Sequence, residues 1–481
     1  MSYCDLALHT DKYQINMMYA HWKNGTHNRK TVFDAYFRKL PFAGGYAVFA
    51  GLKRIVEYVE QICFKEEDLA YLAAQPERYD QAFLNELRKF RFAGSIYAVR
   101  EGTIVFPNEP LIRVEGRVFE TQLIETALLN FMNYQTLIAT KASRIKQTSP
   151  ADVFLEFGSR RAQEADAAIW GARAAYIAGF AATSNVRAGK LFGIPAVGTH
   201  SHSWVQMFPS ELEAFLSFAR ACPDHVTLLV DTYDTLKSGI PNAIQAAKIL
   251  AEEGIRLKSV RLDSGDLAYL SIKAREMLDQ AGLRDVKIIA SNDLDEDTIF
   301  HLKAQGCRID MWGVGTHLIT AQDQPSLGGV YKLAAKENGG VFEPTIKISA
   351  NPEKVTTPGI KEVYRIIGGK SGKAEADYIA LTEEDDVKQG KRIKLFDPVH
   401  PYLKKWISDY VAVPLLDPII VNGERTGELP DLAEIRNHHQ RQIGLFWPEY
   451  LRRLNPEIYP VDLSQKTWDL RMEMIKTVTG Q

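Results

Sequence analysis

Ionisable side chains in this 481-residue chain gather directly after short apolar runs, where they could carry out chemistry. The first such group is Glu156-Phe157-Gly158-Ser159-Arg160-Arg161. We interpret it as a strand that passes into a helix, with both arginines in the first helical turn. Because cations there face the positive end of the helix dipole, the pair indicates a site for a polyanion such as pyrophosphate. The plainer alternative is a solvated pair, or arginines bound to Glu156 or Glu164.

A histidine-containing group, Gly198-Thr199-His200-Ser201-His202-Ser203-Trp204, follows the apolar run Ile194–Val197. A histidine at the carboxyl end of a strand is well placed as a nucleophile, an acid–base group or a metal ligand. Asp231 ends the next apolar run and could hold the imidazole in one tautomer, as carboxylates do for catalytic histidines. For His200 an ordinary turn position is the simpler interpretation.

The same two histidines also support a rival hypothesis. His200 and His202 could bind zinc as a pair, with Asp263 or Asp266 completing the metal site of a hydrolase.

Two carboxylates, Asp263 and Asp266, stand three residues apart in Arg261-Leu262-Asp263-Ser264-Gly265-Asp266. Such a pair can offer oxygens to a sugar diol or to Mg2+. Asp266 is also a plausible N-cap for the next helix, whereas Asp263 has no obvious capping duty. Arg261 shares its side of the strand with Asp263, because alternate residues of a strand point the same way.

Glycines follow another apolar run, in Trp312-Gly313-Val314-Gly315-Thr316-His317. Glycine lets backbone amides approach a phosphate, and the Thr316 hydroxyl adds a donor. The pattern also marks ordinary tight turns. Ser291-Asn292-Asp293 follows the preceding run and either adds polar groups to the same face or forms a turn.

The elements that must position these groups are six apolar runs, each followed by a polar turn and a helix-like stretch. This alternation predicts a parallel sheet whose loops meet at the carboxyl ends of the strands. The sequence does not separate a barrel from an open sheet, although the even spacing slightly favours a barrel. The six runs are Val153–Phe157, Ile194–Val197, Val226–Val230, Val260–Leu262, Val286–Ala290 and Met311–Val314.

The flanking regions have a mixed pattern, and we expect three parts, at residues 1–135, 136–335 and 336–481. The first is an α+β domain, the second the βα domain, and the third a C-terminal segment packed on both. Within the first part the pattern predicts a strand at Val32–Phe37, a helix at Val48–Val59, short strands within Ile104–Val118 and a long buried helix at Glu120–Lys146.

Composition excludes several classes of protein. Hydrophobic residues make up 46% and charged residues 25%, as in globular proteins, and the net charge of -2 gives no attraction to nucleic acid or anionic lipid. The four cysteines are scattered, which makes a disulfide framework or a zinc knuckle improbable and favours a reducing compartment. No early apolar run or bilayer-spanning segment is present. We expect a cytoplasmic protein.

Taken in order, these motifs resemble the nicotinate phosphoribosyltransferase family, which belongs to the type II phosphoribosyltransferases. The resemblance is close and covers nearly the whole chain. It rests on Thr10-Asp11-Lys12-Tyr13-Gln14, residues 156–162, Gly198-Thr199 with His202, residues 261–266, residues 313–316, and Pro325-Ser326-Leu327-Gly328-Gly329-Val330-Tyr331-Lys332-Leu333.

The resemblance implies an incomplete βα barrel, an α+β domain from the N-terminal region, C-terminal additions, and a homodimer with shared active sites. It implies that ATP phosphorylates His202, with Asp231 as its orienting carboxylate. The implied nicotinate contacts are Tyr13 (from the partner subunit), Thr199, Arg261 and Arg160. The implied phosphoribosyl pyrophosphate contacts are Arg161, Asp263, Ser291, Gly315 and Thr316. His200 departs from the family pattern and receives no role.

The implied reaction joins nicotinate to phosphoribosyl pyrophosphate and releases pyrophosphate. It belongs to NAD biosynthesis, with ATP as a cosubstrate and Mg2+ as a cofactor. No residue is assigned to the metal. The alternatives are nicotinamide phosphoribosyltransferase, quinolinate phosphoribosyltransferase, the zinc hydrolase above, and a dimer that senses nucleotides without turnover.

Overall fold

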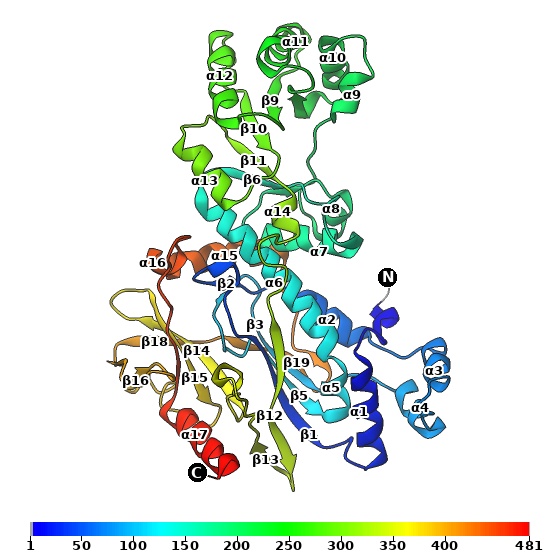
Figure 1. Ribbon diagram of the computed structural model, residues 1–481, viewed down its shortest axis with the longest axis vertical. Coiled ribbons are helices and arrows are strands. Elements are labelled where there is room, and N and C mark those ends of the chain that lie inside the picture. Colours follow the sequence, from blue (N-terminus) through cyan, green and yellow to red (C-terminus); the bar gives the residue numbers. More distant parts are fainter. Residues whose placement is uncertain (1–2, 481) are drawn as a thin grey trace. The chain divides into compact units, whose positions relative to one another are not determined.

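The chain divides into two compact units (Figure 1), and the computed structural model describes residues 3–480. Unit 1 joins Met1–Leu137 with Ser326–Gln481, and unit 2 is Ile138–Pro325. The boundary falls inside helix α6 (Glu125–Thr148), which with α5 (Val118–Leu123) covers the long buried helix expected at Glu120–Lys146. N- and C-terminal segments therefore fold together in unit 1.

Unit 2 contains a six-stranded, wholly parallel sheet in the order β7-β6-β11-β10-β9-β8. This is the cyclic order of a βα barrel in which β7 and β8 fail to pair, so the sheet curls without closing. The incomplete barrel is confirmed. The apolar runs predict five of its strands correctly, because strands buried on both faces read as nearly continuous apolar segments.

The expected strand at Ile194–Val197 is wrong. The segment makes a single parallel bridge, from Ala196 to Thr183, and the strand beside it is the two-residue β7. Pro195 has no N–H to give to a ladder, and β7 is too short to show a pattern in sequence. This stretch lies at the open seam of the barrel, and the chain passes from it to His202.

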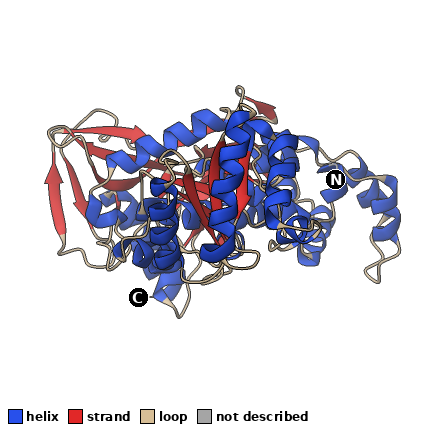
Figure 2. Cartoon of the chain, turned by 90° about the horizontal axis from the view of Figure 1, so that it is seen from above, coloured by secondary structure: helices blue, strands red, loops and turns tan. Residues whose placement is uncertain are grey.

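Helices follow the strands of unit 2 in the alternation expected from the sequence (Figure 1), and the chain as a whole is rich in both helices and strands (Figure 2). The strands are β6 (Val153–Glu156), β7 (Ala182–Thr183), β8 (Val226–Leu229), β9 (Leu257–Leu262), β10 (Lys287–Ser291) and β11 (Met311–Val314). The helices are α7 (Glu164–Ile177), α8 (Val186–Phe192), α9 (His202–Gln206), α10 (Glu211–Ala221), α11 (Ile240–Glu252), α12 (Leu267–Gln280), α13 (Glu296–Ala304) and α14 (Thr316–Ile319).

Unit 1 is built on a seven-stranded sheet in the order β13-β12-β1-β5-β3-β19-β20 and a four-stranded sheet in the order β18-β14-β15-β21. Strand β19 (Leu416–Val421) pairs with β3 (Ser95–Val99), so the C-terminal region completes an N-terminal sheet. The expected strand at Val32–Phe37 is confirmed as β1 (Lys30–Phe37).

The helix expected at Val48–Val59 begins late, at Leu52, and Val48 belongs to a short strand instead. Gly51 between them has φ +110°, a conformation that favours glycine, and its N–H donates to Glu101 Oε1 at 2.7 Å. A backbone turn invisible to hydrophobic periodicity therefore sets the start of the helix.

The other helices of unit 1 lie around these sheets (Figure 1), and its other strands belong to them or to the two-stranded sheets β16-β17 and β2-β4. Its other helices are α1 (Lys12–Lys23), α2 (Leu52–Gln61), α3 (Glu66–Ala73), α4 (Gln81–Arg88), α15 (Leu432–Leu445), α16 (Pro448–Leu451) and α17 (Gln465–Thr479). Its other strands are β2 (Ala47–Val48), β4 (Ile104–Val105), β5 (Ile112–Arg117), β12 (Gly329–Asn338), β13 (Val341–Pro344), β14 (Lys361–Gly368), β15 (Ala374–Leu381), β16 (Ile393–Phe396), β17 (Lys404–Ile407), β18 (Tyr410–Pro414), β20 (Glu424–Arg425) and β21 (Val461–Leu463).

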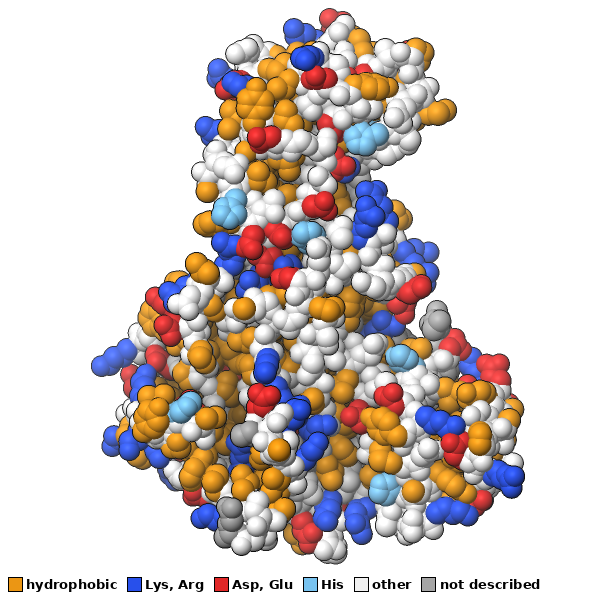
Figure 3. All heavy atoms as spheres, viewed as in Figure 1, with side chains coloured by type: hydrophobic (Ala, Val, Ile, Leu, Met, Phe, Trp, Pro, Cys, Tyr) orange, Lys and Arg blue, Asp and Glu red, His pale blue; other side chains and the backbone are white. Residues whose placement is uncertain are grey.

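Surface chemistry follows the near-neutral composition. Acidic and basic side chains are intermixed on the face in Figure 3. Among residues 3–480, no helix combines the length and apolar character needed to cross a bilayer. One feature departs from the sequence expectation, since Cys63 is disulfide-bonded, whereas Cys222 and Cys307 are free. Scattered cysteines give no spacing from which that bond could have been predicted.

A buried ion pair fixes the middle of unit 1. Arg365 on β14 donates from Nε to Asp377 Oδ1 at 2.9 Å and from Nη2 to Asp377 Oδ2 at 2.6 Å, and both side chains are fully buried. Arg365 also donates to Gln442 Oε1 and to the Ile104 carbonyl, both at 2.7 Å. Burial, with the negative charge of Asp377 next, raises the pKa of neighbouring Glu109 well above its usual range. The arginine thus compensates the charge of this acidic cluster.

We predict that Arg365→Met lowers the free energy of unfolding by about 3–5 kcal/mol, because the buried Asp377 carboxylate loses its bidentate cationic partner. Urea unfolding followed by circular dichroism measures the change. Arg425→Met is the matched control, since Arg425 pairs with Glu60 at the partly exposed surface, and its cost is about 1 kcal/mol or less. Equal costs for both variants would contradict a structural role for the buried pair.

Candidate active site

Arg261, on β9, is the centre of a polar cluster at the carboxyl ends of the strands in unit 2. Its guanidinium donates to Ser291 Oγ at 2.8 Å, to Thr199 Oγ1 at 3.2 Å and to Asp263 Oδ1 at 2.9 Å. These partners come from the end of β10, the barrel seam and the end of β9 itself. One planar side chain therefore ties three loops together, and two of its five N–H donors have no protein partner within the described residues.

His202 lies at the start of α9 with its side chain 41% exposed. Its Nδ1 is 3.1 Å from Thr232 Oγ1. Its Nε2 lies 4.0 Å from Asp231 Oδ1 and 4.0 Å from Asp263 Oδ2, and it has no hydrogen bond within residues 3–480. The imidazole thus presents one reachable nitrogen between two carboxylates. The sequence did not single out Thr232, although its place directly after Asp231 was a usable signal.

The side chain of Asp231 is almost fully buried, at 2% exposure, and its two carboxylate oxygens have different surroundings. Oδ2 accepts from the Asp263 N–H at 2.9 Å and from Ser264 Oγ at 2.6 Å. Oδ1, on the His202 side, is buried without a hydrogen-bond partner among the described residues. A buried carboxylate oxygen without a donor is costly, so this atom favours a proton donor or a cation beside it.

The turn after β6 is held by Glu156, which sequence reasoning considered only as a partner for arginine. Its buried carboxylate accepts from the Gly158 N–H and from Thr183 Oγ1. Burial raises the pKa of Glu156. The next residue, Phe157, places its ring 5.6 Å from the Arg261 guanidinium carbon, at cation–π distance. Local contacts thus join the β6 turn to the Arg261 cluster.

Arg160 and Arg161 were expected in the first turn of a helix, and this prediction is wrong. Helix α7 begins only at Glu164, and its first turn carries Glu164 and Asp166, the charges that a helix N-terminus favours. Both arginines lie in the preceding turn, are exposed, and form no ion pair with any described residue. Neither Glu156 nor Glu164 neutralises them, so their charges remain available to an anionic ligand.

Gly315 and Thr316 follow β11 beside the β6 turn. A β-carbon at Gly315 would lie 3.2 Å from the Phe157 carbonyl oxygen, so the two turns are in close contact. The Thr316 side chain has no hydrogen bond within the described chain. Two residues on, His317 Nδ1 lies 3.0 Å from Asp295 Oδ2, a second histidine–carboxylate pair at this rim.

The remaining predicted residues have mixed outcomes. Ser291 lies within the cluster and donates to Asp263 Oδ1. Asp266 is confirmed as an N-cap, accepting from the Tyr269 N–H at 3.0 Å. Tyr13 lies in unit 1, half-exposed, at a cavity that Glu125 and Lys332 also line. Burial, then the charges of Glu125 and Asp11, raises the pKa of Tyr13.

Three family models match successive parts of the chain. Residues 8–133 match the nicotinate phosphoribosyltransferase N-terminal domain, residues 153–358 the nicotinate phosphoribosyltransferase family, and residues 360–471 the C-terminal domain. The nicotinate phosphoribosyltransferase of Bacillus subtilis (strain 168) is 54% identical over 476 residues, covering 99% of this chain and 96% of the relative. This chain belongs to the nicotinate phosphoribosyltransferase family.

Solved structures agree with that assignment. The crystal structure of human nicotinic acid phosphoribosyltransferase matches with a TM-score of 0.86 at 30% identity, covering 97% of this chain and 99% of the human chain. The crystal structure of nicotinate-nucleotide pyrophosphorylase from Pyrococcus furiosus matches with a TM-score of 0.68 at 25% identity, covering 92% and 95%. As a member of the nicotinate phosphoribosyltransferase family, the chain is an enzyme with the type II phosphoribosyltransferase fold.

Membership of the nicotinate phosphoribosyltransferase family does not favour the zinc hydrolase, and the geometry of His200 argues against it. His200 is buried, its Nε2 accepts from the Leu229 N–H at 3.2 Å, and its Nδ1 faces the Ser201 carbonyl at 3.3 Å. Both nitrogens are therefore occupied by backbone groups. Burial lowers the pKa of His200 to about 4.

We predict that His200→Gln weakens the loss of stability in acid. Below pH 6.5 the unfolded chain binds a proton that folded His200 refuses until about pH 4, so unfolding becomes easier as the pH falls through this window. Removing this group makes the decline between pH 6 and pH 5 shallower by roughly 1 kcal/mol. Urea unfolding at several pH values measures it. The exposed His225→Gln variant should keep the parental slope; a parental slope in His200→Gln would refute the assignment.

Proposed function

We propose that this enzyme joins nicotinate to phosphoribosyl pyrophosphate, forming nicotinate mononucleotide and pyrophosphate, in a reaction coupled to ATP through a phosphohistidine at His202. The observation that carries the proposal is the meeting of Arg261, Asp263, Asp231 and His202 at one rim of the barrel. A cation for an acidic substrate, a carboxylate for a diol and a reachable imidazole nitrogen lie within one cluster. The reaction serves NAD biosynthesis.

Arg261 is the proposed partner of the nicotinate carboxylate, together with Thr199 and Arg160. The two spare donors of Arg261 can make charge-assisted hydrogen bonds to a carboxylate, and nicotinamide offers only a neutral carbonyl. The Phe157 ring below the guanidinium limits its movement. Tyr13 of the partner subunit is proposed to close the base pocket in a homodimer with shared sites.

The phosphoribosyl pyrophosphate contacts are proposed to be Arg161, Asp263, Ser291, Gly315 and Thr316. Asp263 Oδ2 has no hydrogen bond within the described chain and can accept from a ribose hydroxyl. Gly315 and Thr316 form the turn for the 5′-phosphate, and unpaired Arg161 neutralises the pyrophosphate. The ring nitrogen of nicotinate attacks C1 of the sugar while the bond to pyrophosphate breaks, and the positive charge that develops on the sugar lies near these carboxylates.

In this proposal Thr232 sets the tautomer of the His202 imidazole. If Nδ1–H donates to Thr232 Oγ1, the lone pair of His202 lies on Nε2, which can attack the γ-phosphorus of ATP as ADP leaves. The phosphoryl group adds negative charge to a nitrogen 4.0 Å from two carboxylates, so the phosphorylated state is electrostatically strained. Hydrolysis relieves that strain and can drive product release. Asp231 makes no hydrogen bond to the ring and acts on His202 through its charge at 4.0 Å.

Mg2+ fits this donor set. It prefers oxygen ligands and is usually held by one or two carboxylates together with substrate phosphates. Asp231 Oδ1, buried without a donor, and Asp263 Oδ2 are the oxygens that would hold it. When bound, the cation would neutralise phosphate charge beside the two carboxylates.

The setting of the enzyme is part of the proposal. We place it in the cytoplasm, where ATP is available, with no nucleic acid or membrane as partner. The three-part division at residues 1–135, 136–335 and 336–481 stays a prediction about which segments fold as domains.

We predict that His202→Ala removes the ATP effect. The ratio of turnover with ATP to turnover without ATP should fall to about one, because no imidazole remains to carry the phosphoryl group. Nicotinate mononucleotide formation is measured with and without ATP, and acid-labile label from γ-labelled ATP is counted on the protein. His225→Ala is the control that removes an exposed histidine of the same unit. ATP stimulation that persists in His202→Ala would exclude the phosphohistidine.

We predict that Arg261→Lys lowers selectivity for nicotinate over nicotinamide. Loss of the planar fork should lower kcat/KM for nicotinate by roughly 10- to 100-fold, the value of a charge-assisted hydrogen bond. Nicotinamide turnover should fall less, because nicotinamide has no carboxylate to lose a charge-assisted hydrogen bond. General damage to the cluster would instead lower turnover of both substrates alike. Arg220→Lys, at an exposed ion pair on α10, should leave both rates unchanged. An unchanged selectivity ratio in Arg261→Lys would sink this role.

A further inference from the structure

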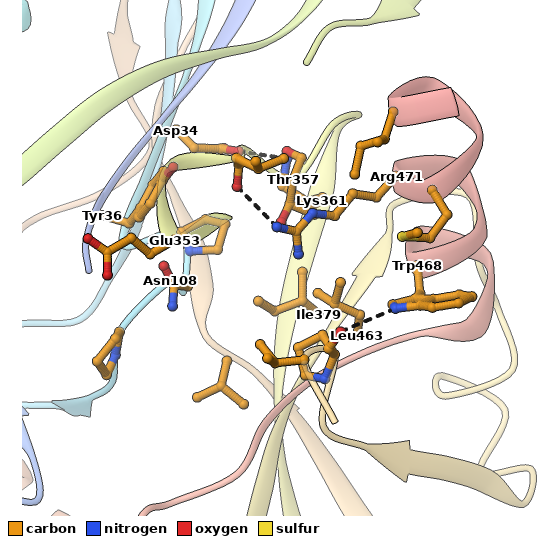
Figure 4. A pocket seen from close by; sticks show the side chains of 18 of the residues that line it. Asp34, Tyr36, Asn108, Glu353, Thr357, Lys361, Ile379, Leu463, Trp468 and Arg471 are labelled. Carbon is orange, nitrogen blue, oxygen red and sulfur yellow. Dashed lines mark hydrogen bonds and ion pairs between the residues drawn. The ribbon is translucent and has the colours of Figure 1, made fainter. Parts of the chain in front are cut away.

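Unit 1 contains a cavity of about 820 Å3 that the proposed reaction does not use. It lies between the end of β1, strands β14, β15 and β21, and helix α17 (Figure 4). Its volume is within the range of small-molecule sites, roughly 300–1,000 Å3. All of its lining residues belong to unit 1.

Most of the cavity wall is apolar. Ile379 and Leu463 lie beneath the centre of the cavity, and Trp468 projects from α17 beside them (Figure 4). The indole N–H of Trp468 donates to the Pro398 carbonyl at 3.4 Å, which holds the ring in place. The wall therefore offers a fixed aromatic surface against which a flat apolar body can pack.

One charged pair in the wall is already neutral. Lys361 Nζ lies 2.8 Å from Asp34 Oδ2 and donates to the carbonyls of Thr357 and Gly359 at 2.9 and 2.7 Å. All three ammonium donors are thus used, and this pair is a structural part of the wall. Glu353, at the rim, lies 3.7 Å from Lys39.

Arg471 is different, because no carboxylate compensates its charge. It projects from α17 into the cavity (Figure 4), and its only hydrogen bond within residues 3–480 is from Nη2 to the Val355 carbonyl at 3.2 Å. Its Nε is buried without a partner among the described residues. Burial lowers the pKa of Arg471, and the ionisable group acting next on it is the Tyr36 hydroxyl, which is uncharged at neutral pH. A half-buried guanidinium with free N–H donors in a mostly apolar cavity is therefore suited to bind an anion.

We propose that this cavity is a second ligand site, which binds a small organic anion with a flat apolar body. The anionic group, a carboxylate or a phosphate, binds the free donors of Arg471. The flat body packs between Trp468 and the side chains of Ile379 and Leu463. The cavity residues belong to unit 1, whereas the Arg261 cluster belongs to unit 2. The proposal does not depend on the reaction assigned to that cluster.

The test uses the full-length protein and three matched probes. 1-Naphthoate and 1-naphthyl phosphate carry the two possible anionic groups, and 1-naphthamide is the neutral isostere. Each is titrated by isothermal calorimetry in the presence of saturating nicotinate, which keeps the base pocket of the active site filled. Proteins compared are the parent, Arg471→Met, and Lys466→Met, which removes an exposed cation from the same helix.

We expect at least one acid to bind the parent about 10-fold or more tightly than the amide, as charge-assisted hydrogen bonding to arginine requires. That preference should disappear in Arg471→Met and persist in Lys466→Met, while the amide binds all three proteins alike. The tighter acid identifies the anionic group as carboxylate or phosphate. No binding of either acid to the parent, or an equal preference in Arg471→Met, would overturn the proposal.

Folding is checked independently, since Arg471 also contacts the Val355 carbonyl. Arg471→Met should keep the parental circular dichroism spectrum and its catalytic rate with nicotinate. If that variant does not fold, Trp468→Leu serves instead and should weaken both acids and the amide together by removing the aromatic wall. Unchanged affinity for all three probes in Trp468→Leu would equally overturn the site.

Discussion

Parallel strands place all their carboxyl ends at the same edge of a sheet, and the active-site rim depends on that constraint. Arg261 turns the shared edge into a single unit, since its guanidinium holds Asp263, Ser291 and Thr199 at once. Ser291 and Thr199 lie 30 and 62 positions from Arg261 along the chain, yet hydrogen bonds to one rigid plane fix their relative positions. Ser291 also donates directly to Asp263, so the particular contribution of Arg261 is to connect Thr199 of the seam to the ends of β9 and β10.

The open seam of the barrel explains the position of His202. Between β7 and β8 no ladder closes the sheet, and the chain between them carries Thr199 to the guanidinium and His202 to the buried carboxylate of Asp231. A closed barrel would have committed this segment's backbone to neighbouring strands. An incomplete one leaves it to bring the side chains of Thr199 and His202 to the carboxyl ends of the strands.

Two arginines of unit 1 show how the surroundings of a buried cation distinguish structure from binding. Arg365 has a bidentate carboxylate, an amide and a carbonyl around it, so its charge and its donors are satisfied inside the protein. Arg471 has one carbonyl and no carboxylate among the residues that the structure describes. Desolvating a cation without compensation is unfavourable. At Arg471 the folded chain leaves this desolvation cost uncompensated, and the proposed anion would offset it.

Sequence alone determined the local features of this protein. Buried apolar runs marked five of the six barrel strands, Asp266 marked the start of α12, and the ordered motifs marked the family, because periodicity, capping and short motifs are properties of neighbouring residues. Tertiary structure decided the rest. In the folded chain, Arg160 and Arg161 lie in a turn before the helix, and Ile194–Val197 makes a single bridge. His202 lies beside Thr232, and Arg471 has no carboxylate partner within residues 3–480. Each of these outcomes depends on which distant residue the chain path brings near, and distance in space is not encoded in spacing along the sequence.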